Sequence, residues 1–177
     1  MTQVKFANPA PLGLAGFALT TFLLSCVNAG WLSGSDVWVG FAVAYGGAAQ
    51  LCAGMWEFAS GNTFGAVAFS SYGAFWLGTA IYVWFFAGHA KSVGTDLAYL
   101  LGAWTIFTAY MTAIIFRTDN GPVKGVFGTL LITFILLWLG AWFGNASLTV
   151  IGGYLGVITA LAAWYASWKM VNDSIAA

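Results

Sequence analysis

The side chains most able to bind a ligand in this sequence are amides and hydroxyls at the starts of long apolar runs. Asn8 stands at the first run, and Asn62-Thr63 stand at the third. Asparagine is a good helix N-cap, and a helix N-terminus offers free N–H groups and partial positive charge, which suit an anion. Pro9 and Pro11 fit a first helical turn but remove two of its donors. These positions therefore indicate either plain capped helix starts or a binding site for a carboxylate.

Helical spacing extends these ends into the apolar runs. Thr21 shares a helical face with Phe17 in the first run, while Tyr72 lies in the third run and Leu130 in the fifth. A path with polar ends and an aromatic-aliphatic neck would pass a small carboxylic acid, whereas a strongly hydrated ion would meet a dewetting barrier. Gln50, in the second run, is a buried amide that is satisfied either by a neighbouring helix or by water in such a path. Ordinary core packing is the alternative for each aromatic side chain.

Two titratable side chains stand near the ends of the runs. Glu57 closes the second run, where it either caps and positions the turn or serves as a protonatable group at the inner mouth. His89 is either a solvated loop residue or a source of pH dependence at the outer mouth. No charged residue lies in the middle third of any run, and the sequence contains no metal-ligand cluster and no Ser-His-Asp set. We therefore expect neither catalysis nor a metal or other cofactor.

The elements that must position these residues are membrane spans. The chain is 61% hydrophobic and only 6% charged, against about 25% charged in a soluble domain. Apolar runs with the roughly 20 residues needed to cross a bilayer lie near 12–31, 37–58, 64–88, 97–116, 125–143 and 149–168. The runs are continuous rather than alternating, which favours helices over a β-barrel. The sequence predicts an all-α membrane protein, with residues 1–177 forming one six-helix transmembrane domain.

The basic residues predict the orientation of these spans. An even number of spans places both termini on one side, where Lys5, Arg117, Lys124 and Lys169 then lie, with Lys91 opposite. Because basic residues favour the cytoplasmic side, we expect a multi-pass protein of the cytoplasmic (inner) membrane with both termini in the cytoplasm. Membrane lipid is then a partner. Zero net charge and the lack of a basic tract argue against nucleic acid as another.

A repeated dipeptide indicates internal symmetry. Gly61-Asn62 precedes the third span and Gly144-Asn145 precedes the sixth. With three spans per unit, the two asparagines lie at opposite membrane faces, as an inverted-topology 3+3 repeat would place them. Chance is the alternative for so short a match.

Several ordered motifs carry a resemblance that covers nearly the whole chain. They are Asn8-Pro9-Ala10-Pro11-Leu12-Gly13-Leu14; Tyr45-Gly46-Gly47 with Gln50, Ala53-Gly54 and Glu57; Gly61-Asn62-Thr63-Phe64-Gly65; Ser71-Tyr72-Gly73-Ala74-Phe75-Trp76; and Gly144-Asn145. In these motifs the chain resembles the acetate uptake transporter family (GPR1/FUN34/YaaH). The resemblance implies a six-helix membrane protein that moves acetate and, in some members, succinate.

The resemblance also implies an assembly and a site. Structurally known bacterial relatives are hexamers with a pore in each protomer, and their constriction of a Phe, a Tyr and a Leu maps onto Phe17, Tyr72 and Leu130. Ala163 falls near a position linked to substrate choice in relatives. The candidate substrate-binding residues are Asn8, Leu12, Thr21, Gln50, Asn62, Thr63 and Asn145. Members of the family have been described both as proton-coupled symporters and as anion channels, and the sequence leaves both open.

These observations favour a membrane pathway for acetate-sized monocarboxylates and possible succinate use. Two alternatives remain. The absence of mid-membrane charge also allows a pore for a neutral solute such as water or ammonia, and it allows a non-transporting membrane subunit.

Overall fold

The computed structural model describes residues 7–33 and 36–176, and these residues are helical apart from short connections. The helices are α1 (Ala10–Asn28), α2 (Val37–Val43), α3 (Gln50–Ala59), α4 (Thr63–Ile81), α5 (Val93–Ile115), α6 (Gly121–Phe143) and α7 (Ala146–Ala176). A π-helical segment, Ala44–Ala49, joins α2 to α3, and α4 continues through Tyr82–Phe86 and Ala87–His89. Six of the resulting helical units are long and apolar enough to cross a membrane. The prediction of an all-α membrane protein with six spans is confirmed.

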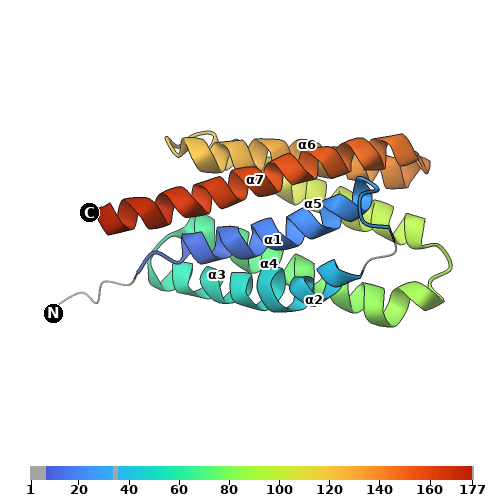
Figure 1. Cartoon of the computed structure of the whole chain (residues 1–177), viewed down its shortest axis with the longest axis horizontal. Coiled ribbons are helices and arrows are strands. Elements are labelled where there is room, and N and C mark those ends of the chain that lie inside the picture. The colour runs from blue at the N-terminus through green and yellow to red at the C-terminus, as the bar shows by residue number, and fades with distance from the viewer. Residues whose placement is uncertain (1–6, 34–35, 177) are drawn as a thin grey trace.

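The start of α1 and the end of α7 lie at the same end of an elongated bundle (Figure 1). Arg117 and Lys124 flank the α5–α6 connection at that end, and Lys91 lies in the α4–α5 connection at the opposite end. Lys5, the remaining basic residue of the orientation argument, falls outside the described residues. We call the end that carries the start of α1 and the end of α7 the proximal end, and the other the distal end.

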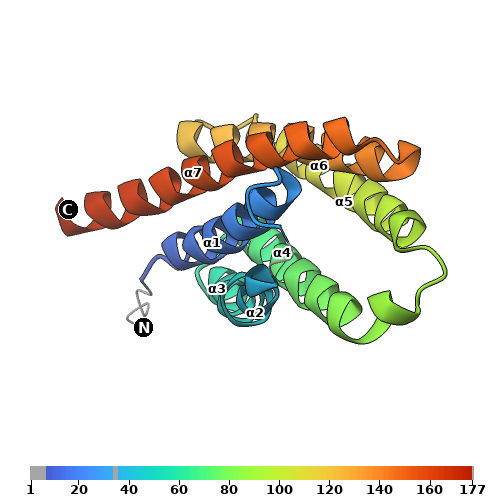
Figure 2. The same cartoon turned by 45° about the vertical axis from the view of Figure 1, so that its right-hand side comes forward.

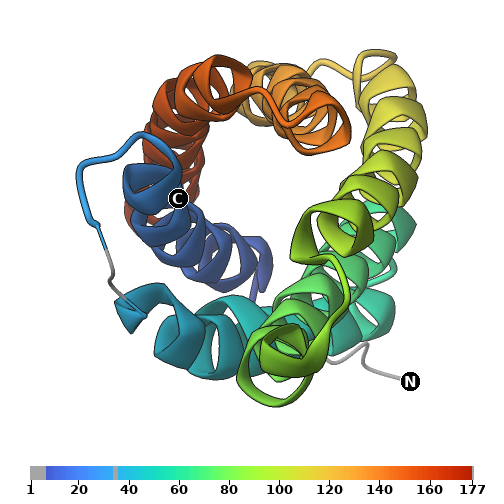
Figure 3. The same cartoon turned by 90° about the vertical axis from the view of Figure 1, so that its right-hand side faces the viewer.

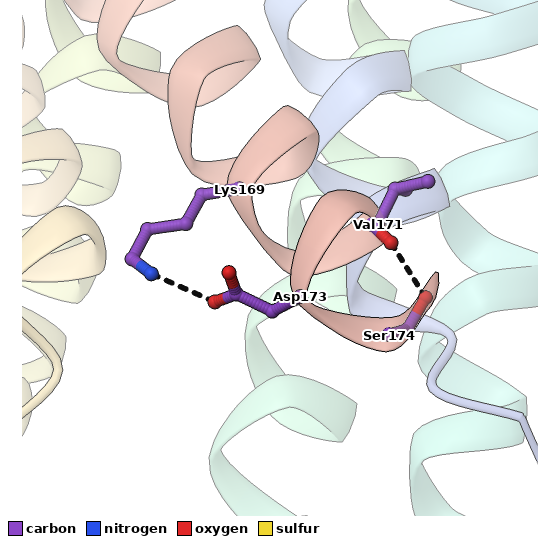
Figure 4. A network of polar contacts seen from close by, with 4 residues as sticks. All are labelled: Lys169, Val171, Asp173 and Ser174. Atoms are coloured by element: carbon purple, nitrogen blue, oxygen red, sulfur yellow. Dashed lines mark hydrogen bonds and ion pairs between the residues drawn. The ribbon is translucent and has the colours of Figure 1, made fainter. Parts of the chain in front are cut away.

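Helix α7 is longer than a bilayer requires. Its 31 residues span about 46 Å at 1.5 Å per residue, whereas the hydrocarbon core is about 30 Å thick. Its last turns are polar: Lys169 Nζ lies 2.7 Å from Asp173 Oδ2, and the Ser174 hydroxyl donates to the Val171 carbonyl at 2.7 Å (Figure 4). The helix therefore continues past the predicted span end at residue 168, into a part suited to water.

Helices α1 and α7 pack at very short range because glycines lie between them. A Cβ placed on Gly153 would lie 2.7 Å from the carbonyl carbon of Asn28, and one placed on Gly156 would strike the Ser25 hydroxyl. At the proximal end, the Ser167 hydroxyl donates to the Pro11 carbonyl at 2.7 Å. Contacts at both ends fix the two helices side by side along their length, as the end-on view also shows (Figure 3).

The two Gly-Asn turns adopt the same local structure. Gly61 and Gly144 have φ of 77° and 60°, a left-handed conformation that glycine adopts at no steric cost. In each turn the next residue caps the following helix, since Asn62 Oδ1 accepts from the Gly65 N–H at 3.2 Å and Asn145 Oδ1 from the Leu148 N–H at 3.3 Å. The shared geometry is compatible with the inverted repeat.

The helices stand around a common axis when viewed from the end (Figure 3). Helices α4 and α5 diverge toward the distal end (Figure 2). A cavity of about 340 Å³ lies between them, and the Tyr82 hydroxyl donates to Asp96 Oδ2 across it at 2.7 Å. Large buried side chains from α1, α4, α5 and α6 form the core that surrounds the candidate site.

Candidate functional site

A cavity of about 270 Å³ opens at the proximal end. It lies among the first turns of α1, α4 and α6, the last turn of α5, and the middle of the second span. Its polar lining residues, among those described, are Gln50, Asn62, Tyr72, Thr118 and Asn120. The rest of its wall is apolar, and we call it the proximal cavity.

A smaller cavity of about 50 Å³ lies on the distal side. Thr21, Ser25 and Asn28 of α1 line it together with Trp76 of α4 and Thr133 of α6. The Thr21 hydroxyl and the Trp76 indole N–H are buried and have no hydrogen-bond partner among the described residues. Two residues of the distal cavity wall therefore each carry an unpaired polar group that is sealed from solvent.

Phe17, Tyr72 and Leu130 line both cavities. Each is buried, at 5%, 3% and 4% exposure, and the rings of Phe17 and Tyr72 are 5.9 Å apart between centroids. The three side chains come from α1, α4 and α6, so they converge only through the fold. We call this apolar boundary between the two cavities the neck.

Tyr72 is held firmly in the neck. Its hydroxyl is 2.9 Å from the Thr108 hydroxyl of α5, and its ring packs against Trp104 and Phe107 with centroids 5.6 and 5.3 Å away. The hydroxyl is thus engaged with a neighbouring helix. What Tyr72 presents to the two cavities is mainly an aromatic ring.

Replacing Tyr72 with phenylalanine should therefore change stability more than selectivity. Loss of one buried hydrogen bond costs about 1 kcal/mol, which lowers the thermal midpoint of a chain of this size by about 2–4 °C. Acid size selectivity should stay as in the wild type because the ring remains. Thermal unfolding in detergent measures the effect, with Tyr110→Phe on α5 as control, because the Tyr110 side chain is largely exposed. Equal midpoints for both variants would contradict the assigned hydrogen bond.

Asparagine side chains accept hydrogen bonds at the starts of three helices at the proximal end. Asn62 and Asn120 are the N-caps of α4 and α6, whereas Asn8, expected from the sequence to be an N-cap, precedes the N-cap of α1, Pro9. Asn8 Oδ1 accepts from the Ala10 N–H at 3.0 Å, and Asn120 Oδ1 accepts from the Val123 N–H at 3.3 Å, as Asn62 does at α4. Asn62 and Asn120 also line the proximal cavity, whereas Asn8 is exposed beside it. The positive ends of α1, α4 and α6 therefore face the same region, which favours an anion there.

The two buried polar residues of α3 have different relations to this cavity. Gln50 and Glu57 are each 1% exposed, but only Gln50 lines the cavity. The Glu57 carboxyl lies behind Gly65, where an added Cβ would be 2.8 Å from Glu57 Cδ, and the Glu57 backbone carbonyl accepts from the Asn62 N–H at 3.0 Å. This arrangement suits positioning of the Asn62 turn.

Several residues singled out from sequence line neither cavity. Leu12 is 45% exposed, and Thr63 is exposed at the start of α4. His89 and Asn145 are exposed at the distal end, and Ala163 is fully buried within α7. The fold thus brings together Gln50, Asn62 and the neck on the proximal side, and Thr21 and the neck on the distal side.

Sequence reasoning missed Thr118 and Asn120 on the proximal wall. Asn120 stands at the start of the fifth apolar run, as Asn8 and Asn62 stand at the first and third. The same capping pattern, applied to every odd-numbered run, would have found it.

The site suits binding and passage rather than bond breaking. No charged side chain lines either cavity among the described residues. Within residues 7–33 and 36–176, no group of three or more His, Cys, Asp or Glu side chains could hold a metal ion. Two cavities in line, joined at an apolar neck inside six membrane-length helices, define a helical membrane protein of the small-solute transport class.

The chain belongs to the GPR1/FUN34/yaaH family, whose family model matches residues 1–176. This confirms the resemblance carried by the sequence motifs. A solved structure, described as that of the bacterial acetate channel SatP, superposes with a TM-score of 0.87 at 36% identity and covers 96% of this chain and 95% of that one.

Named relatives include transport proteins from bacteria and fungi. The succinate-acetate/proton symporter SatP of Escherichia coli K12 is 40% identical over 179 residues, covering 98% of this chain and 93% of that protein. The ammonia transport outward protein 2 of Saccharomyces cerevisiae is 44% identical over 170 residues, covering 91% and 60%. Acetate permease A of Emericella nidulans is 40% identical over 191 residues, covering 96% and 63%. This chain therefore spans about three fifths of the two fungal proteins. None of these names describes an enzyme, in line with the sequence prediction.

Proposed function

We propose that this chain carries acetate and similar small monocarboxylates across the membrane, with succinate as a further candidate substrate, through a path within each protomer. The observation that carries the proposal is the neck: Phe17, Tyr72 and Leu130 stand where the proximal and distal cavities meet. The names of the bacterial symporter, the bacterial channel and the fungal permease support the same substrate class. Residues 1–177 act as one transmembrane domain in this proposal.

The proposed roles follow the order of the path. At the proximal mouth, the helix starts beside Asn8, Asn62 and Asn120 attract the carboxylate, and at the distal side Thr21 offers a hydroxyl. The sequence also proposes substrate-binding roles for Leu12 and Thr63 near the proximal mouth and for Asn145 near the distal mouth. It proposes a proton or pH role for Glu57, behind the proximal wall, and for His89, near the distal mouth, and a role in substrate choice for Ala163 within α7.

The proposed setting is the cytoplasmic (inner) membrane, with the proximal end in the cytoplasm. Arg117, Lys124 and Lys169 lie toward the proximal end and Lys91 toward the distal end, which fits the positive-inside rule. A homo-hexamer is the proposed assembly, on the resemblance to hexameric relatives.

Labelled acetate uptake into liposomes containing the purified chain tests the proposal. We expect uptake well above that of protein-free liposomes, and inhibition by unlabelled acetate but not by a large acid. Uptake equal to that of protein-free liposomes would contradict transport and would favour a non-transporting membrane subunit.

A pore for ammonia is the second candidate function. The name of the yeast relative favours it, and so does the lack of a charged side chain on the described walls of the proximal and distal cavities. Acetate should compete with ammonia flux if both use the neck. Ammonia flux without any acetate flux would favour this candidate over the first.

Replacing Asn8 with alanine should weaken acetate uptake by a few fold while the protein stays assembled. The change removes the Oδ1 acceptor that binds the Ala10 N–H at the start of α1, and loss of one such hydrogen bond costs about 1 kcal/mol. Ser92→Ala is the matched control, because Ser92 Oγ accepts from the Thr95 N–H to cap α5 at the distal end. Equal acetate uptake by Asn8→Ala and Ser92→Ala would mean that Asn8 only stabilises the start of α1 and does not contribute to substrate binding.

A further inference from the structure

The cavity of about 340 Å³ between α4 and α5 lies outside the proposed path, and we call it the lateral cavity. It is present because the two helices diverge toward the distal end (Figure 2). Its lining residues on the third span are Ala74, Phe75, Gly78, Thr79 and Tyr82, and those on α5 are Asp96, Leu100 and Trp104.

The lateral cavity opens to the outside of the bundle. Ala74 and Gly78 are exposed, and at about 100° per residue they point well away from the neck residue Tyr72 on the same helix. A Cβ placed on Gly78 would have nothing within 4 Å. A molecule in the surrounding bilayer can therefore enter this cavity without passing the neck.

The lateral cavity is an elongated slot that follows the helices. Asp96, Leu100 and Trp104 are spaced four residues apart, so they share one face of α5. At 1.5 Å per residue they extend over about 12 Å along the helix. Ala74 and Gly78 share a face of α4 in the same way. Because both helices are membrane spans, the slot runs in the direction that a lipid acyl chain takes.

Polar and apolar groups occupy opposite ends of this slot. At the distal end, Asp96 lies in the first turn of α5, and the Tyr82 hydroxyl donates to its Oδ2 at 2.7 Å. Lys91 lies in the connection just before this turn. The inner end is aromatic, since the rings of Phe75 and Trp104 pack with centroids 5.0 Å apart. The slot is therefore polar near the membrane surface and apolar toward the middle, in the order of a phospholipid.

Phe75 separates the lateral cavity from the distal cavity, because it lines both. Its ring also packs against Phe134 of α6, with centroids 5.8 Å apart. The nearby Thr79 hydroxyl already donates to the Phe75 carbonyl at 2.7 Å. An apolar chain in the lateral cavity would therefore end against the outer side of a ring whose inner side faces the distal cavity.

The charges at the distal end favour one kind of lipid headgroup. Asp96 is exposed, and a carboxylate accepts about four hydrogen bonds, of which Tyr82 supplies one. A primary ammonium offers three N–H donors for charge-assisted hydrogen bonds to it. Lys91 is exposed five residues earlier and suits a phosphate. A headgroup with an ammonium and a phosphate matches both signs.

We propose that the lateral cavity binds one acyl chain of a phospholipid with a primary ammonium headgroup, phosphatidylethanolamine, from the leaflet at the distal end. The ammonium binds Asp96, the phosphate lies near Lys91, and the chain extends between α4 and α5 to Phe75. This site is separate from the proposed path and does not depend on which solute crosses the membrane.

Native mass spectrometry of the purified full chain tests the headgroup. Phosphatidylethanolamine, phosphatidylcholine and phosphatidylglycerol with the same acyl chains are titrated separately. Phosphatidylcholine lacks N–H donors, and phosphatidylglycerol lacks a positive charge. We expect wild-type protein to bind phosphatidylethanolamine about fivefold more tightly than either, the effect of one exposed ion pair. Asp96→Asn should abolish this preference, whereas Asp36→Asn, at an exposed position before α2 at the distal end, should retain it.

Filling the slot tests the position of the chain. Gly78→Leu places a side chain in the lateral cavity, and leucine is favoured over glycine inside a helix. Tight binding of phosphatidylethanolamine should therefore be lost. Gly125→Leu is the matched control, because a Cβ there also has nothing within 4 Å but the residue lies on α6, away from the slot. It should bind the lipid as the wild type does.

Photolabelling locates the chain directly. The wild-type full chain is placed in phosphatidylcholine vesicles that contain a small fraction of phosphatidylethanolamine with a diazirine on one acyl chain. After illumination, the labelled peptides are identified by mass spectrometry. We expect the labels to concentrate within residues 74–82 and 96–104, which line the slot.

Three results would overturn the inference. They are equal affinity for the three lipids, labels spread evenly over the exposed faces of all spans, and unchanged binding of phosphatidylethanolamine by Gly78→Leu. A changed oligomer mass in Gly78→Leu with unchanged lipid binding would instead assign the slot to a second copy of this chain. The lipid titration and the photolabelling need only wild-type protein, so a variant that fails to fold does not block the test.

Discussion

Leu130→Ala is expected to let acids larger than acetate cross the membrane. The side chain stands in the neck at 4% exposure, and its truncation widens the boundary between the two cavities. One methylene more or less in an apolar pocket changes the discrimination between two substrates by about tenfold or more. We therefore expect the ratio of butyrate to acetate uptake to rise at least about tenfold. Phe17→Ala should act in the same direction, since Phe17 packs against Tyr72 from the opposite helix.

The measurement is uptake of labelled butyrate and acetate into liposomes, compared at equal protein content. Ile132→Ala is the matched control, because it removes a similar volume from the same helix at a position 51% exposed on the outside of the bundle. It should leave the ratio unchanged. A butyrate-to-acetate ratio that is the same in Leu130→Ala, Phe17→Ala and Ile132→Ala would show that Leu130 and Phe17 do not line the transport path.

Gly153→Ala is expected to have the largest effect on stability. Its new Cβ would lie 2.7 Å from the Asn28 carbonyl carbon and 2.9 Å from the Ala29 Cα, so it meets backbone rather than a mobile side chain. Overpacking of this kind costs about 1–3 kcal/mol, and the thermal midpoint should fall by about 5 °C or more. Because α1 carries Phe17, acetate uptake should fall as well.

Gly125→Ala provides the comparison for this prediction. Gly125 is inside α6, and a Cβ there has nothing within 4 Å. Alanine is favoured over glycine in a helix by about 0.5–1 kcal/mol. The thermal midpoint of Gly125→Ala should therefore stay at the wild-type value or rise slightly. Thermal unfolding in detergent measures both variants. A midpoint for Gly153→Ala at or above that for Gly125→Ala would contradict the close α1–α7 packing.

The spans and their capped starts could be predicted from sequence because they depend on local properties. Apolar length marks a membrane helix, and an asparagine before an apolar run marks its start, as at Asn62 and Asn145. The convergence of Phe17, Tyr72 and Leu130 was available only from the family resemblance. In a membrane both the core and the outside are apolar, so hydrophobic periodicity cannot tell which side of a span faces inward.

Two features of the site could not be predicted. The π-helical segment before Gln50 has no distinctive spacing in the sequence, yet it determines which face carries the amide. The second feature is which buried hydroxyls remain unpaired, because most buried threonines bind their own helix. The Thr79 and Thr133 hydroxyls donate to carbonyls four residues earlier, at 2.7 and 2.9 Å. The hydroxyls of such threonines are already bonded, and only the wider fold shows that Thr21 is different.

The projecting end of α7 has a practical consequence for imaging this small protein. The helix runs without interruption from Ala146 to Ala176, and its final turns carry the Lys169–Asp173 ion pair outside the apolar bundle (Figure 4). A helical fusion partner joined in phase at this end would continue the same rod rather than swing on a flexible linker. Because the added helix would continue α7, which packs against α1, it would be a rigid marker for aligning electron micrographs of a small membrane protein.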